Sequence, residues 1–209
     1  MKNKIVDLTY TFTDNMPVYP GDPPSSLKQV ASIEKNTYTD HEIKSLMHVG
    51  THMDAPLHMI ENGKTIDKIN PDKFFGKGVL IDARNQKEIG TSLLKDVIIP
   101  EGAIVLIYTG FAEKYRTKEY FENYPSMTKE FAQAMVDKKV KIVGMDILGP
   151  DTDVSWPTHK ILLGKETLII ENLSNLSDLL NVKAFDVVAL PAKYKAEASP
   201  VRVLVLIKE

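Results

Sequence analysis

The chain has 209 residues, of which 43% are hydrophobic and 26% charged, and its 26 basic and 28 acidic side chains give a formal charge of −2. This composition is typical of a folded protein that needs no metal or disulfide merely to fold, and it excludes a disordered chain. The absence of cysteine excludes disulfides, iron–sulfur clusters, cysteine-based zinc fingers and thiol nucleophiles. Any metal site must therefore use histidine, aspartate and glutamate.

The net charge and the length of the apolar runs indicate which partners and which cellular location to expect. Near-neutral charge gives no reason to expect nucleic acid or an anionic membrane as a partner. The apolar run that starts at Ile5 is broken at Asp7, so no signal-peptide core is expected. The apolar run 201–207 is far shorter than the ~20 residues that span a bilayer. We therefore expect a cytoplasmic protein.

Strand-like segments recur along the chain. Runs rich in Val and Ile lie between Gly, Pro or charged residues, which is typical of strands. The run Ala103–Tyr108 is apolar at every position, as expected for a strand covered on both faces. The predicted strands are residues 4–10, 78–83, 103–109, 140–146, 167–170, 185–190 and 201–207.

Helix candidates lie between the predicted strands. Residues 128–138 begin with Thr128 as a candidate N-cap and carry apolar residues at helical spacing. Residues 173–180 and 111–115 are two further candidates, and the proline-dense stretch 16–24 predicts a rigid loop. No segment resembles an interdomain linker. The pattern predicts one α/β domain over residues 1–209, with a mixed, largely buried sheet flanked by helices.

Three of the five histidines fall within the segment HVGTHMDAPLH, residues 48–58. In a helix, Asp54 and His58 would rotate away from His48 and His52, and Pro56 opposes a helix. In extended geometry, with its period of two, all four polar side chains face one side. We therefore expect extended or loop geometry to bring the four side chains together at one locus.

Imidazole nitrogen and carboxylate oxygen are ligands that zinc and manganese accept, and a His-x-x-x-His-x-Asp set leaves coordination positions open for water. The competing interpretation, ordinary polar residues on a solvated strand, is disfavoured because the four side chains share one face beside an apolar one.

Three polar residues later in the chain allow two interpretations each. Glu171 follows an apolar run, so it either ends a strand, where ligand sites gather in α/β sheets, or begins the next helix at the surface. His159 is either a ligand or an exposed cap residue. Asp146 either orients a ligand histidine or forms a turn.

Residues 48–58 resemble the His-x-Gly-Thr-His-x-Asp-x-Pro-x-His signature of the cyclase family of metal-dependent hydrolases, which includes kynurenine formamidase and isatin hydrolase. Residues 15–22, 159–164, 170–173 and 199–202 resemble further segments of that family. The resemblance implies the family's swivelling β/α/β fold.

The resemblance also implies roles for individual residues. It makes His48, His52 and Asp54 ligands of a first divalent metal, zinc by first choice and manganese by second. A second ion would be bridged by Asp54 and Glu171 and completed by His159. His58 matches the catalytic acid/base. Tyr19 stands where kynurenine formamidases carry a substrate-contacting Trp.

The implied function is hydrolysis of a small, non-peptide aryl formamide or cyclic amide, with N-formylkynurenine, an intermediate of tryptophan catabolism, as first choice. An isatin hydrolase-like or other cyclic amide or lactone hydrolase is the alternative, as is a non-catalytic metal- or ligand-binding protein using the same pocket. A serine hydrolase is disfavoured because no Gly-x-Ser-x-Gly elbow is present. The family also implies a homodimer or homotetramer.

Overall fold

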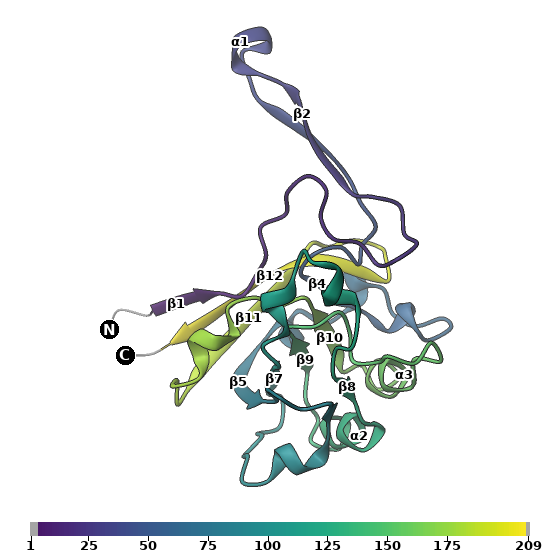
Figure 1. Cartoon of the computed structure of the whole chain (residues 1–209), viewed down its shortest axis with the longest axis vertical. Helices are drawn as coiled ribbons and strands as arrows, with labels where there is room; N and C mark the ends of the chain where they lie inside the picture. Colours follow the sequence, from purple (N-terminus) through teal and green to yellow (C-terminus); the bar gives the residue numbers. More distant parts are fainter. Residues whose placement is uncertain (1–3, 208–209) are drawn as a thin grey trace.

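A computed structural model describes residues 4–207 (Figure 1). Within this range, one sheet has the strand order β1-β12-β11-β5-β7-β9-β10-β4, and β4 pairs in addition with β12. The sheet therefore closes on itself as a barrel. Its strands are β1 (Lys4–Asp7), β4 (His52–Asp54), β5 (Phe75–Asp82), β7 (Ile104–Tyr108), β9 (Ile142–Met145), β10 (Leu168–Glu171), β11 (Phe185–Pro191) and β12 (Ala198–Ile207).

The long strand β12 makes the closure. The register pairs its last residues, from Leu204 to Ile207, with β1 and its first, from Ala198 to Pro200, with β4. Strands β5, β7, β9 and β10 run parallel, whereas β4, β11 and β12 pair antiparallel with their neighbours. The prediction of a mixed sheet is confirmed.

Strand β7 shows how the core divides into two layers. Ile104 and Leu106 lie in one hydrophobic cluster with side chains from the facing strands, inside the barrel. Val105 and Ile107 lie in a second cluster on the outer face, with residues of the helices α2 and α3. All residues of β7 are buried, so the prediction of a strand covered on both faces is confirmed.

The helices are few and lie on the outside of the barrel. Helix α2 (Lys129–Asp137) starts as predicted, because the Thr128 side chain accepts a hydrogen bond from the Phe131 amide at 3.2 Å. Helix α3 (Pro157–Leu163) was not among the predicted elements. The predicted helices at 111–115 and 173–180 are 3₁₀ turns, η5 (Phe111–Lys114) and η7 (Leu176–Leu179).

The expectation of a sheet flanked by helices is only partly right. Helices α2 and α3 pack on the outer face of the sheet. The side chains of the inner face pack against one another, because the strands close around them. No second helical layer is needed for that face. The remaining 3₁₀ turns are η1 (Pro56–His58), η2 (Ile66–Lys68), η3 (Pro71–Phe74), η4 (Thr91–Leu94) and η6 (Lys118–Phe121).

A hairpin arm projects from the barrel (Figure 1). It consists of β2 (Ser26–Ala31) and β3 (Asp40–Lys44), joined by the short helix α1 (Ile33–Asn36). A further small pair is formed by β6 (Glu88–Ile89) and β8 (Ser126–Met127). Across residues 4–207, no helix combines the length and the apolar character that crossing a membrane requires.

Candidate metal centre

His52 and Asp54 lie on β4, two residues apart, so their side chains share one face of the strand while Met53 points into the barrel core. Glu171, at the end of β10, pairs directly with His52 across the sheet. His52 Nε2 lies 3.3 Å from Glu171 Oε2 and 3.4 Å from Asp54 Oδ1. All three side chains are buried. Glu171 therefore ends a strand and does not begin a helix.

His48 and His58 approach the same carboxylate from the two ends of the segment. His48 Nδ1 lies 3.0 Å from Asp54 Oδ1, and the rings of His48 and His58 are 4.1 Å apart between centroids. The predicted convergence is present, with extended geometry along β4 and turns on either side of it. A turn through Gly50, with φ +72°, folds His48 back, and Pro56 opens the 3₁₀ turn that carries His58.

His159 reaches the cluster from the first turn of α3. Its Nε2 lies 3.2 Å from Glu171 Oε1, and the side chain is buried. His159 is therefore no exposed cap residue. Six of the polar residues singled out from the sequence lie in one connected cluster, His48, His52, Asp54, His58, His159 and Glu171.

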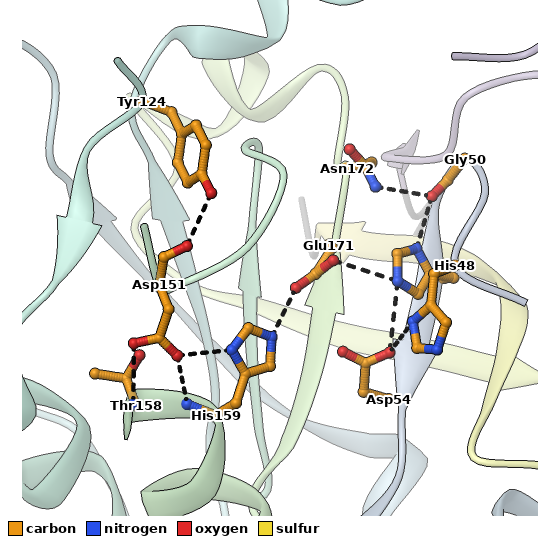
Figure 2. A network of polar contacts seen from close by, with 10 residues as sticks. His48, Gly50, Asp54, Tyr124, Asp151, Thr158, His159, Glu171 and Asn172 are labelled. Carbon is orange, nitrogen blue, oxygen red and sulfur yellow. Dashed lines mark hydrogen bonds and ion pairs between the residues drawn. The ribbon is translucent and has the colours of Figure 1, made fainter. Parts of the chain in front are cut away.

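Asp151 was missed in the sequence, and it orients His159 (Figure 2). Its Oδ2 accepts hydrogen bonds from His159 Nδ1 at 2.7 Å and from the His159 amide at 2.9 Å, while Oδ1 accepts from the Thr158 amide. Asp146 instead accepts hydrogen bonds from Thr109 and the Gly110 amide, so it ties the end of β9 to the end of β7 and does not orient His159. In the sequence, the one signal for Asp151 is Pro157, because a proline is common in the first turn of a helix and the free amides of that turn need a hydrogen-bond acceptor.

Three atoms at the centre of the cluster have no hydrogen-bond partner. His52 Nε2 and both carboxylate oxygens of Asp54 are buried, and within residues 4–207 none of them has a partner of acceptable geometry. Leaving such groups unsatisfied costs several kcal/mol unless an ion compensates. Ligand atoms of His52, Asp54 and Glu171 lie within 4.8 Å of one another, as do those of His48, Asp54 and His58. The residues fit a divalent metal.

In the cluster, neighbouring carboxylates raise the pKa of the His52 and His159 imidazoles, and neighbouring imidazoles lower the pKa of the carboxylates. Burial lowers the pKa of His52, but Asp54 and Glu171 outweigh it and raise that pKa to about 9. In the same way Asp151 and Glu171 overcome burial and raise the pKa of His159 to about 10. Burial raises the pKa of Asp54, yet His52 and His48 hold it below its usual range. The carboxylates thus stay ionised and available to a cation.

His58 differs from these histidines. Burial lowers its pKa, and the attraction of Asp54 does not restore it. The ring is therefore neutral near pH 7 and has a lone pair free to accept a proton.

A cavity of about 250 Å³ opens beside the cluster. Part of its wall is aromatic or apolar, and its polar lining comes from Asp22, His48, His58, Asp151, His159 and Glu171. Tyr19, singled out from the sequence, lines it and is 42% exposed. Two aromatic neighbours were missed, Tyr124 and Trp156. Trp156, the single tryptophan of the chain, also meets the His159 ring edge-on at 5.5 Å.

Proteins of known structure share this fold, and a further relative is similar in sequence. A potential metal-dependent hydrolase with cyclase activity is 30% identical, with a TM-score of 0.82 over 100% of both chains. Isatin hydrolase A from Labrenzia aggregata, bound to benzyl benzoate, is 26% identical, with a TM-score of 0.87 over 99% of this chain and 94% of that one. A kynurenine formamidase from Geobacillus thermodenitrificans is 29% identical over 206 residues, 97% of each chain.

The fold, the buried ligand cluster and these relatives define a metal-dependent hydrolase. Residues 6–152 match the family model described as putative cyclase. The chain belongs to the cyclase family.

Proposed function

We propose that this hydrolase cleaves the carbon–nitrogen bond of a small aryl formamide or cyclic amide. N-formylkynurenine, giving kynurenine and formate, is the first choice. One observation carries the proposal: residues of the buried ligand cluster line a cavity with aromatic walls. His58, whose ring is neutral, lines the same cavity. The names of the relatives, kynurenine formamidase and isatin hydrolase, support the same bond type.

His48, His52 and Asp54 would hold one divalent ion, zinc first and manganese second. Glu171 and His159, with Asp54 shared, would hold another. When bound, the metal lowers the pKa of a coordinated water and polarises the carbonyl under attack. The protein's part is to keep the carboxylate ligands ionised and to fix the ligand side chains in place.

His58 is the proposed acid/base. It lines the cavity, and its neutral imidazole can take the proton of the attacking water and return it to the leaving nitrogen. A site that only stores metal has no need for such a group. This residue therefore favours catalysis over the alternative of a metal- or ligand-binding protein.

The cavity favours a flat ring. Tyr19, Tyr124 and Trp156 present aromatic faces or edges, and a volume of about 250 Å³ suits one small ligand. Aromatic pairs contribute about 0.5–1.5 kcal/mol beyond the area they bury. A cavity of this volume disfavours an extended peptide, and its aromatic lining favours an aryl or fused cyclic amide.

The test is a comparison of kcat/KM for N-formylkynurenine, isatin and a simple aliphatic formamide on zinc-loaded and manganese-loaded protein. We expect one of the two aromatic amides to be the best substrate. Preference for isatin would select the cyclic-amide alternative. Fully loaded protein that hydrolyses none of the three amides would contradict the proposal and favour a binding protein.

We also propose that the chain assembles as a homodimer or homotetramer through the hairpin arm. A two-stranded hairpin is marginal by itself in water, yet this arm exposes large apolar side chains, among them Val30 at 59%, Ile33 at 72% and Ile43 at 58%. Val30→Glu together with Ile33→Glu should lower the molar mass measured by light scattering. The control Lys28→Glu, on the same strand, should leave it unchanged. A wild-type monomer would contradict the proposal.

A further inference from the structure

We propose that Asn172 is a positioning residue for the metal centre: it holds the Gly50 carbonyl that in turn fixes the ring of His52. The inference rests on the proposed role of His52 as a metal ligand. Asn172 follows Glu171 directly, is 4% exposed, and does not line the cavity. It therefore acts through other residues and not on a substrate.

The Gly50 carbonyl oxygen is the centre of this arrangement (Figure 2). It accepts one hydrogen bond from His52 Nδ1 at 2.9 Å and a second from Asn172 Nδ2 at 3.1 Å. A carbonyl oxygen can only accept, so Nδ1 of His52 carries a proton. The other ring nitrogen, Nε2, is thereby directed at Asp54 and Glu171, which lie 3.4 and 3.3 Å away.

The same reasoning orients the amide of Asn172. Its Nδ2 must face the Gly50 carbonyl, so its Oδ1 faces the other way and accepts a hydrogen bond from the Tyr120 hydroxyl at 2.7 Å. Tyr120 is 1% exposed, and burial raises the pKa of its hydroxyl well above the usual value. The phenol therefore stays protonated and continues to donate.

The backbone of Asn172 joins the two segments that carry ligands. Its φ of +57° lies in the left-handed region, which Asn tolerates better than most residues. Its carbonyl accepts a hydrogen bond from Thr51 Oγ1 at 2.6 Å, and Thr51 precedes His52. Side chain and backbone together thus fasten the turn before β4 to the end of β10. This residue couples the position of His52 to that of Glu171.

Asn172→Asp keeps the size and the Tyr120 partner but replaces the donor by a carboxylate oxygen. That oxygen would face the Gly50 carbonyl 3.1 Å away and repel it. We expect the turn to shift and the ring of His52 to lose its fixed direction. Loss of the direct partner of a ligand histidine costs roughly 10–100-fold in metal affinity, and here that partner is the Gly50 carbonyl that Asn172 holds.

The experiment measures zinc affinity of the full chain by competition with a chromophoric chelator. Asn172→Asp should weaken zinc binding roughly 10–100-fold. Tyr120→Phe, which frees the amide to rotate, should weaken it by less. Asn175→Asp is the matched control, because Asn175 also has a left-handed backbone, with φ +55°, and its Nδ2 donates to the Asp7 carbonyl at 2.9 Å. It should bind zinc like the wild type.

Thermal unfolding of the metal-free variants separates positioning from general stability. Weaker zinc binding by Asn172→Asp, with a Tm no lower than that of Asn175→Asp, supports the inference. A lower Tm with wild-type zinc affinity overturns it and leaves Asn172 a structural residue. If Asn172→Asp does not fold, the zinc affinity and the metal-free Tm of Tyr120→Phe decide in the same way.

His52→Ala keeps this inference distinct from the proposed function. Wild-type zinc affinity in that variant would overturn the ligand assignment itself. Loss of zinc by His52→Ala, with wild-type affinity in both Asn172→Asp and Tyr120→Phe, would overturn the positioning role alone.

Discussion

Glu171 and His52 face each other across the antiparallel pair of β10 and β4, and Glu171 Oε2 lies 3.3 Å from His52 Nε2. Successive strand residues point to opposite faces, so a register shift of one residue would bring Ile170, an interior side chain, to this position. Packing of the barrel interior therefore fixes the register. The same register brings together ligand-type groups that are far apart in the sequence.

The first prediction concerns the metal itself. His52→Ala should weaken zinc retention by more than the 10–100-fold typical of a residue that only supports a ligand, and chelation should abolish hydrolysis until zinc or manganese is restored. Metal content after dialysis and the activity of the same samples are the measurements. His41→Ala is the control, because His41 is exposed on the hairpin arm. Full activity in metal-free protein would refute the assignment.

The second prediction separates acid/base chemistry from metal binding. His58→Ala should keep its metal and lose roughly 10²–10⁴-fold in kcat/KM, the usual contribution of a general acid/base. Metal analysis and steady-state kinetics on one preparation provide the readout. An equal loss of metal would make His58 a ligand instead, and wild-type kinetics would leave it without a catalytic role.

The third prediction is a pH dependence of metal binding. With pKa values of about 9 and 10, His52 and His159 are protonated near pH 7 in the metal-free protein. A metal must displace these protons, so zinc affinity should rise as pH rises from 7 towards 9, and binding should release protons. Calorimetry in buffers of different ionisation enthalpy measures the release. Buffer-independent heats together with pH-independent affinity would contradict it.

The site could be predicted from the sequence where its residues are close in the chain. His48, His52, Asp54 and His58 fall within 11 residues, so local spacing alone indicates that they converge. The details differ because the period of two holds only along β4, and a positive φ at Gly50 and a 3₁₀ turn at Pro56 complete the arrangement. The four side chains can therefore meet even where the backbone departs from an extended strand, so their meeting is easier to predict than the secondary structure that carries them.

The distant parts of the site follow from the closure of the sheet. Asp151, Tyr124 and Trp156 come from segments whose approach depends on that closure and on α3. Strand β4 is only three residues long, yet it joins β10 to β12. Such a short segment has no hydrophobic periodicity from which its pairing could be predicted. For the same reason the sheet was expected between helices rather than closed.

The fourth prediction concerns the aromatic wall of the cavity. Tyr19→Ala should lower kcat/KM for N-formylkynurenine roughly 2–10-fold, the equivalent of the 0.5–1.5 kcal/mol of an aromatic contact, and leave an aliphatic formamide unaffected. Trp156→Ala should lower it as well, with metal content measured because Trp156 also contacts His159. Tyr38→Ala is the control, since Tyr38 is 58% exposed and lies outside the cavity lining. Equal turnover of aryl and aliphatic formamides, unchanged by Tyr19→Ala, would show that the aromatic wall does not select the substrate.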